Sequence, residues 1–214
     1  MNLYWHTKEN NKNLILIFNG WGCDEHILVG VHKNHYDLLL LSDYSDLDHS
    51  FLREIELYES IIVIAWSFGV TIANYFLSYL SRVSLAIAVN GTVYPVDNDK
   101  GIPTPIFQAT LQGFSALTSH KFFLRMMGGA KNLKRYEQLL PKRSISDQQK
   151  ELNQFRKWAA LNTSISTKWS QVIIGMNDLI FPLQNMQKAW IGYPVELKQR
   201  AHFIPFQEII DACL

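Results

Sequence analysis

The stretch that decides the fold is Ile61-Ile62-Val63-Ile64-Ala65-Trp66-Ser67-Phe68-Gly69-Val70. Its first part is a continuous apolar run, which predicts a buried strand. Residues 68–80 then repeat apolar side chains with a helical period, so a helix is expected directly after the strand. A serine on so sharp a turn needs small residues two positions before and after it, and Ala65 and Gly69 meet that need. Ser67 is therefore a candidate nucleophile.

Further apolar runs predict the rest of the sheet. They lie at residues 14–18, 38–41, 85–89 and 172–174, and residues 2–7 and 195–198 are candidate edge strands. Most of the runs are continuous, as expected of parallel strands covered on both faces. The intervals 24–34 and 43–59 leave room only for short helices or loops. Together with the serine turn, this pattern predicts the α/β class, as a compact α/β-hydrolase with a mostly parallel sheet of about seven strands.

The middle of the chain has a different character. Pro95, Gly101, Pro103 and Pro105 predict an irregular exit from the sheet. Helices are then expected at residues 115–127, 132–140 and 147–161, the last one opened by a capping box from Ser146 to Gln149. We therefore expect a hydrolase core at residues 1–93 and 169–214, with a helical lid inserted at residues 94–168.

Composition limits the classes of function. The 214 residues are 48% hydrophobic and 18% charged, and 20 basic residues balance 19 acidic ones. This balance gives no indication of nucleic acid or an anionic membrane as partner. We see no signal peptide, and no apolar stretch is long enough to span a bilayer. With only two cysteines, both expected to be free thiols, we predict a cytoplasmic protein. We also expect it to be a monomer.

Two further side chains complete a catalytic triad in the chain order of this fold, serine then acid then histidine. His202 follows the last predicted strand, whereas His120 falls in the insertion and the other five histidines precede Ser67. An imidazole can take the serine proton and return it to a leaving alcohol. Asp178 follows the strand at 172–174 and is the favoured acid, with Asp97 as the alternative.

The loop after the strand at 14–18 is a candidate oxyanion hole. It reads Asn19-Gly20-Trp21-Gly22-Cys23-Asp24, and its two glycines let the backbone turn an amide toward the site. The amides of Trp21 and Phe68 are the expected donors. The loop lacks the lysine of a phosphate-binding P-loop. No metal or organic cofactor is expected, because a triad performs acyl transfer unaided.

The combined motifs resemble a known family. They are F-N-G-W-G-C-D at 18–24, A-W-S-F-G at 65–69, N-G-T at 90–92, G-I-P at 101–103, N-D-L-I-F-P at 177–182 and A-H-F-I-P-F at 201–206. In this order, over nearly the whole chain, they look like the BioG-type pimeloyl-acyl-carrier-protein methyl ester esterases of biotin synthesis. The resemblance implies release of methanol and pimeloyl-carrier protein, with Ser67, Asp178 and His202 as the triad. Ala65 departs from the usual glycine of G-x-S-x-G by one methyl group.

The insertion offers residues for both parts of such a substrate. Acyl carrier proteins are acidic, and residues 115–145 contain seven basic side chains against one acid, Glu137. The carrier-binding candidates are Arg125, Arg135, Lys142 and Arg143. An acyl chain needs apolar walls, and the candidates for them are Trp21, Trp66, Phe107, Phe122, Phe123 and Met126.

Two other functions remain open from the sequence. A carboxylesterase or thioesterase acting on small acyl substrates would use the same triad without needing a basic lid. A non-catalytic binding protein of the same fold would use neither. A solvated helix face would also explain the basic residues, and a serine in an ordinary strand-to-helix turn would explain Ser67.

Overall fold

The structure is a computed structural model that describes residues 1–158, 160 and 164–214. Within them, strands form one sheet in the order β1-β3-β2-β4-β5-β6-β7. Only β1 among these is antiparallel to its neighbour. The strands are β1 (Asn2–Thr7), β2 (Asn13–Phe18), β3 (Tyr36–Ser42), β4 (Ser60–Trp66), β5 (Val83–Val89), β6 (Gln171–Gly175) and β7 (Val195–Lys198). Every strand expected from the sequence is present, and the α/β-hydrolase architecture is confirmed.

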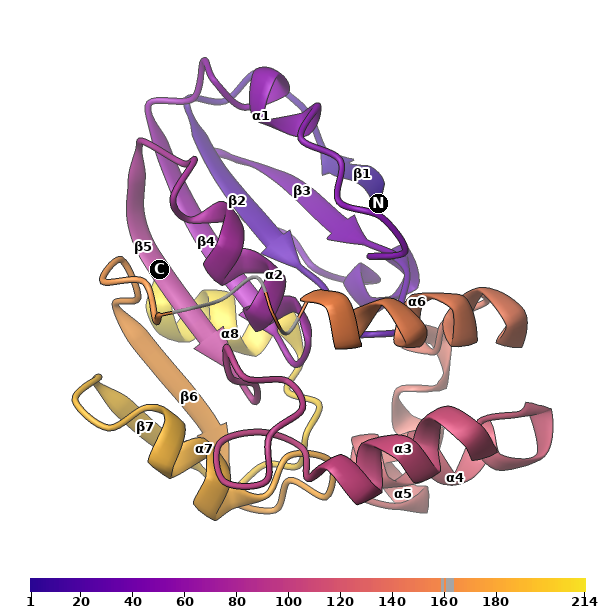
Figure 1. The fold of residues 1–214 in the computed structure, drawn as a ribbon. Coiled ribbons are helices and arrows are strands. Elements are labelled where there is room, and N and C mark those ends of the chain that lie inside the picture. Colours follow the sequence, from indigo (N-terminus) through magenta and orange to yellow (C-terminus); the bar gives the residue numbers. More distant parts are fainter. Residues whose placement is uncertain (159, 161–163) are drawn as a thin grey trace.

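Helices cover both faces of the sheet, which explains the continuous apolar runs. The side chains of Leu14 to Phe18 in β2 are all fully buried. Figure 1 shows α2 (Gly69–Phe76) in front of the sheet and α8 (Phe206–Cys213) behind it. The expected short crossovers are η1 (Glu25–Leu28) and α1 (Phe51–Glu54). The helix predicted at 68–80 is shorter than expected, since α2 ends at Phe76.

The segment between β5 and β6 is helical and gathers beyond the carboxyl ends of the strands (Figure 1). Its elements are α3 (Thr104–Gly113), α4 (Ala116–Met127), α5 (Ala130–Arg135), η2 (Glu137–Leu139) and α6 (Ile145–Trp158). After β6 comes α7 (Leu183–Ala189), which the sequence did not predict. The carboxyl edge of the sheet is where α/β proteins place their active sites.

The insertion differs from expectation in three places. The predicted irregular exit covers residues 94–103, but helix α3, which the sequence did not predict, follows it, because Pro105 lies in the first helical turn, where amides need no helical partner. The helix expected at 132–140 is broken at Tyr136 into α5 and η2. The capping box expected at Ser146 is also wrong: Ser144 Oγ accepts from the Asp147 amide at 3.1 Å, so the helix begins earlier. The end predicted at residue 161 lies outside the described residues.

Candidate active site

Ser67 occupies a strained turn between β4 and α2. Its φ of 59° lies in the left-handed region, which costs energy for any residue with a side chain. Close packing explains the small neighbours, since a Cβ on Gly69 would lie 2.3 Å from the Phe18 carbonyl oxygen. Ala65 pairs with Phe18 and with Ala88 and is fully buried, so the extra methyl is accommodated in the sheet.

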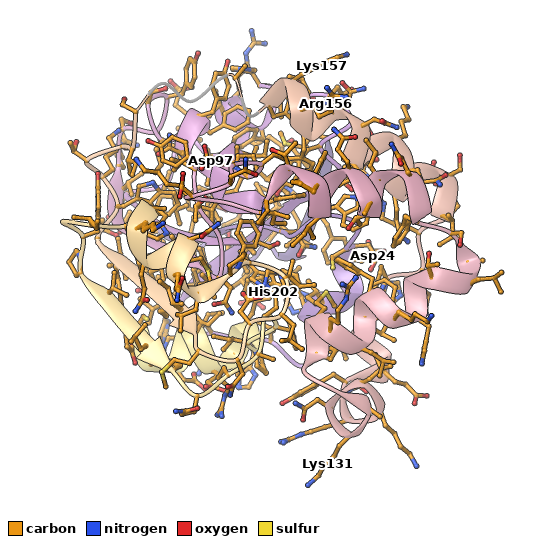
Figure 2. The ribbon with its side chains drawn as sticks, turned by 60° about the horizontal axis from the view of Figure 1, so that its bottom comes forward. Asp24, Asp97, Lys131, Arg156, Lys157 and His202 are labelled. Atoms are coloured by element: carbon orange, nitrogen blue, oxygen red, sulfur yellow. The ribbon has the colours of Figure 1, made fainter. Side chains whose placement is uncertain are left out.

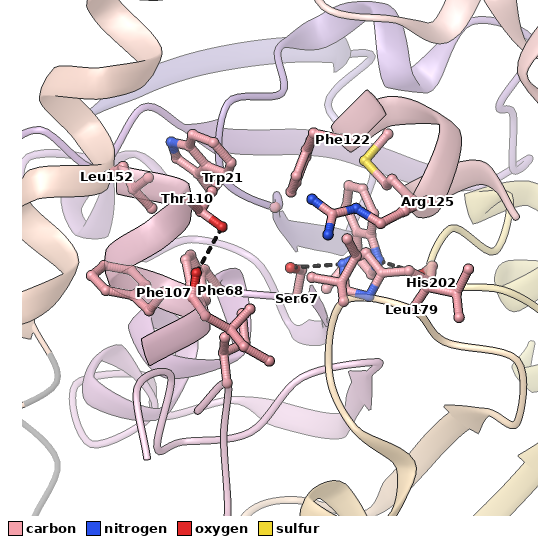
Figure 3. Close-up of a pocket in the computed structure, with 16 residues that line it drawn as sticks. Trp21, Ser67, Phe68, Phe107, Thr110, Phe122, Arg125, Leu152, Leu179 and His202 are labelled. Atoms are coloured by element: carbon pink, nitrogen blue, oxygen red, sulfur yellow. Dashed lines mark hydrogen bonds between the residues drawn. The ribbon is translucent and has the colours of Figure 1, made fainter. Parts of the chain in front are cut away.

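The three expected triad side chains meet at this turn. With its proton on Nδ1, His202 donates to Asp178 Oδ2 at 2.7 Å. Ser67 Oγ then donates to His202 Nε2 at 2.9 Å (Figure 3). Both distances fall within ordinary hydrogen-bond range. At most 9% of any of these residues is exposed, so solvent weakens these interactions little.

The geometry distinguishes the two candidate acids. Asp178 Oδ1 accepts from the amides of Ile180 and Phe181, at 2.7 and 2.9 Å, which leaves Oδ2 for the histidine. The Phe181 ring is stacked on His202, with centroids 5.9 Å apart. Asp97 instead accepts from the amides of Asp99 and Lys100 in its own turn. It lies apart from His202 in Figure 2. The arrangement therefore favours Asp178.

The backbone of His202 is anchored by Asn90 and Trp66, a role that the sequence did not predict for either residue. Asn90 Nδ2 donates to the carbonyl oxygens of His202 at 2.8 Å and Ala201 at 3.0 Å. Its Oδ1 accepts from the Gly175 amide at 2.6 Å, at the end of β6. Trp66 Nε1 donates to the same His202 carbonyl at 2.9 Å. Asn90 begins the N-G-T motif, which was noted in the sequence, but the motif alone did not predict that Asn90 anchors the histidine backbone.

The Gly20–Gly22 loop lies beside the nucleophile, as an oxyanion hole requires. A Cβ on Gly20 would lie 3.2 Å from the Cβ of Ser67. Among the described residues, neither the Trp21 nor the Phe68 amide donates to another protein group, so both are free to bind a developing oxyanion.

Helix α6 is hydrogen-bonded to the Gly20–Gly22 loop. The Gly22 amide donates to Glu151 Oε2 at 3.1 Å, and Trp21 Nε1 donates to the Gln148 carbonyl at 2.7 Å. Glu151 is fully buried and also accepts from the Tyr44 amide. Burial raises the pKa of Glu151, while Arg143 and the two amides act in the opposite direction. The insertion is thus hydrogen-bonded directly to the expected oxyanion loop.

One of the predicted carrier-binding residues is corrected by this network. Arg143 Nη1 pairs with Glu151 at 2.5 Å and Nη2 with Asp43 at 3.0 Å, and only 10% of its side chain is exposed. Because this guanidinium is largely buried and paired with two carboxylates, it is not available to a carrier protein, and the prediction of Arg143 as a carrier-binding residue is corrected. Arg125, Arg135 and Lys142 are exposed.

A small pocket of about 40 Å³ lies over Ser67 (Figure 3). Of the predicted acyl-pocket residues, Trp21, Trp66, Phe107, Phe122 and Met126 line it. Phe123 does not line the pocket, and its ring packs against Phe122, with centroids 5.7 Å apart. The aliphatic walls of the pocket, and the place of the carrier-binding candidate Arg125 among its lining residues, were not predicted from the sequence. These lining residues are Ile102, Ile106, Leu152, Leu179, Ile180 and Arg125.

One cluster of metal-ligating side chains occurs in the described part of the chain, at Asp24, Glu25 and His26. Asp24 Oδ1 already accepts from the His26 amide and contacts its ring, and Oδ2 accepts from the Lys142 amide. The cluster therefore caps η1 and ties it to the insertion. Over the same described residues, no helix is long and apolar enough to span a bilayer.

Comparison with known proteins identifies the family. Residues 2–204 match the family described as pimeloyl-ACP methyl esterase BioG. The solved structure of BioG from Haemophilus influenzae has a TM-score of 0.88 at 30% identity and covers 97% of this chain and 96% of that chain. A lipase-esterase related protein from Clostridium acetobutylicum, at 14% identity and a TM-score of 0.64, shares the fold and covers 100% of this chain and 99% of its own.

A curated relative from Bacteroides fragilis is named malonyl-[acyl-carrier protein] O-methyltransferase. It is 34% identical over 190 residues, which are 88% of this chain, and this chain spans 38% of its length. The family match, the solved BioG structure and the shared architecture all agree. This chain belongs to the BioG family of pimeloyl-ACP methyl esterases, carboxylic ester hydrolases of the α/β-hydrolase fold.

Proposed function

We propose that this chain hydrolyses the methyl ester of pimeloyl-acyl-carrier protein, releasing methanol and pimeloyl-carrier protein, in biotin synthesis. The observation that carries the proposal is the hydrogen-bonded series Ser67, His202 and Asp178 in a member of the BioG family. Serine acts on an ester through an acyl-enzyme, and this series supplies the nucleophile, the base and the group that orients the base.

The first half of the reaction releases methanol. Ser67 Oγ attacks the ester carbonyl carbon while His202 Nε2 takes the serine proton. Asp178 remains ionised and stabilises the resulting imidazolium. The oxyanion of the tetrahedral intermediate is stabilised by the Trp21 and Phe68 amides. When the intermediate collapses, the bond to the methoxy oxygen breaks and His202 returns the proton to that oxygen, so methanol leaves.

The second half releases the free carboxylate. His202 takes a proton from a water molecule, which attacks the acyl-serine carbonyl. The same two amides stabilise the second oxyanion, and the collapse of this intermediate returns the proton from His202 to Ser67 Oγ. The pimeloyl chain then carries a carboxylate at its far end and remains attached to the carrier. The enzyme returns to its starting state without a cofactor.

The charge of the insertion supports a carrier protein as the other part of the substrate. Arg125, Arg135 and Lys142 are exposed on a chain with a formal net charge of only +1. An acidic carrier would be steered by such a local excess of positive charge. The name of the Bacteroides fragilis relative describes a methyl transfer to an acyl group on a carrier, a reaction whose product has the ester chemistry required here.

We further propose that residues 94–168 act as a lid. Their helices α3 and α4 supply much of the pocket over Ser67, including Phe107 and Phe122. A cover of this kind excludes water from the oxyanion and orients the acyl chain.

Purified methyl-pimeloyl-carrier protein tests the proposed function directly. The wild-type chain should convert it to pimeloyl-carrier protein, seen as a shift in carrier mobility on a gel, and Ser67→Ala should not. If the wild type leaves this substrate intact but cleaves p-nitrophenyl esters through Ser67, the chain is a general carboxylesterase. A fluorophosphonate that fails to label Ser67 would indicate a binding protein.

A further inference from the structure

The space above Ser67 is too small for the whole substrate. The pocket over the nucleophile measures about 40 Å³, which accommodates an ester group but not a seven-carbon chain with a prosthetic arm behind it. A groove of about 740 Å³ lies between α3 and α4. Ile106, Thr110, Phe122 and Arg125 line both spaces, so the groove lies directly beside the pocket.

One face of each helix forms the walls of this groove. Helix α3 contributes Ile106, Ala109 and Thr110, and α4 contributes Lys121, Phe122 and Arg125. Residues three and four apart lie on one side of a helix, so the side chains of each helix face the opposite wall. The floor is apolar and buried, since Phe122 is 9% exposed and Phe114 is 3% exposed. A flexible, largely uncharged chain would fit such walls.

The charges of the groove are of one sign. Lys121 and Arg125 are both exposed, and no carboxylate lines the groove. Arg125 borders the catalytic pocket as well, whereas Lys121, one helical turn earlier in α4, borders the groove alone. Lys121 is therefore farther from Ser67 than Arg125 is. A ligand that extends from Ser67 along the groove would place a negatively charged group near Lys121, away from the reacting ester.

We propose that the α3–α4 groove binds the phosphopantetheine arm of the carrier protein, with its phosphate toward Lys121, which lines the groove but not the catalytic pocket. The proposal rests on the proposed function. In that substrate the reacting ester is at the far end of the acyl chain, so the chain and arm must extend from Ser67 toward the carrier. The arm is a flexible chain that ends in a phosphate, and the groove offers apolar walls followed by cations.

Two matched pairs of variants test the proposal. Ala109 is an exposed residue of α3 that lines the groove, so Ala109→Trp should fill the groove. Lys121→Glu reverses the charge at position 121. The controls, Ala130→Trp and Lys134→Glu, make the same changes at exposed positions of a second hollow, beside α5. Each variant is assayed on methyl-pimeloyl-carrier protein, on the free 4′-phosphopantetheine thioester of methyl pimelate, and on a short p-nitrophenyl ester.

Both groove variants should lower kcat/KM for the two arm-bearing substrates by roughly tenfold or more, because Ala109→Trp blocks the arm and Lys121→Glu removes hydrogen bonds to its phosphate. Activity on the short ester should be retained, which also shows that the variants fold. The two controls should behave as wild type on the free thioester.

If Lys121→Glu matches Lys134→Glu on both arm-bearing substrates, the proposal is wrong. A Lys121→Glu defect confined to the intact carrier protein also contradicts it, since the groove would then contact carrier side chains and not the arm. Failure of the wild type on every arm-bearing substrate would instead reject the proposed function, and this proposal with it.

Discussion

The side-chain amide of Asn90 donates to the carbonyl oxygen of His202 at 2.8 Å, across 112 residues of sequence. The same amide donates to Ala201 and accepts from Gly175, so one buried side chain links the end of β5 to the end of β6 and to the histidine loop. Asn90 has a φ of 45°, a left-handed conformation that asparagine tolerates better than most residues. Asn90 is therefore positioned to hold the imidazole at Ser67 without touching substrate.

Replacing Asn90 by glycine should lower kcat while leaving KM nearly unchanged. Glycine keeps the positive φ, so the change removes the amide with little backbone strain. A displaced imidazole should cost roughly 10- to 100-fold in kcat on a short ester. Asn10→Gly is the matched control, because Asn10 also has a positive φ of 60° but is exposed and far along the chain from the triad. Equal kcat values for the two variants would contradict the positioning role.

Asp178→Asn should lower kcat by about 10⁴-fold, as the corresponding change does in a serine protease triad. The asparagine cannot stabilise the imidazolium and favours the wrong histidine tautomer. Asp97→Asn should leave kcat unchanged, because the Asp97 carboxylate is bonded within its own turn. Kinetics of p-nitrophenyl ester hydrolysis measure both. A large loss in Asp97→Asn with little change in Asp178→Asn would reverse the assignment.

Glu151→Gln should weaken transition-state stabilisation. Glu151 accepts from the Gly22 amide, so its charge and position fix the backbone next to the expected Trp21 donor. We expect kcat to fall roughly tenfold, with a parallel loss of affinity for a boronic acid that mimics the tetrahedral intermediate. Asp43→Asn removes the other partner of Arg143 but no contact to the Gly20–Gly22 loop. This control should therefore lower the free energy of unfolding and leave kcat and boronic acid affinity unchanged. Boronic acid affinity that does not change in Glu151→Gln would reject this role.

Arg143→Ala should destabilise the fold by about 3–5 kcal/mol, because it leaves the buried Glu151 without its countercharge. Arg135→Ala, on an exposed part of α5, should change the free energy of unfolding by about 0.5 kcal/mol or less. Urea denaturation at neutral pH measures both. Similar values for the two variants would show that the Arg143 ion pairs contribute little.

Asp37 should make the fold sensitive to acid. Burial alone would raise its pKa, but hydrogen bonds from Tyr58, Glu9 and Asn11 outweigh burial and lower the pKa. A carboxyl whose folded-state pKa is lowered adds stability that is present above its unfolded value, about 3.9, and is lost as pH falls through the folded value. Asp37→Asn should therefore lose stability at pH 7 and show a shallower decline below about pH 4. Parallel stability–pH curves for mutant and wild type would contradict this.

Much of the architecture is local in origin and could be predicted. The strands are continuous apolar runs, and an apolar run is buried whichever strand lies beside it. The bounds predicted for β2 and β4 therefore agree with the observed bounds to within one residue at each end. The turn at Ser67 was also predictable, because the turn requires small residues only at the two positions two residues away, Ala65 and Gly69. Helix α3 was missed because prolines at 103 and 105 predict a break in isolation but are tolerated in a first helical turn.

The sequence by itself determined the order of the strands along the chain, the serine turn and the identity of its histidine partner, since these follow from local periodicity, local sterics and chain order. Only the tertiary structure decided that Asp178 and not Asp97 faces His202, that Arg143 is buried in an ion-pair network, and that Asn90 and Glu151 anchor the catalytic loops. The physical reason is distance along the chain: these contacts join residues as many as 129 positions apart. A side chain's charge or hydrogen-bonding capacity is visible in sequence, whereas the group that satisfies it is chosen by the packing of the whole sheet and its helices.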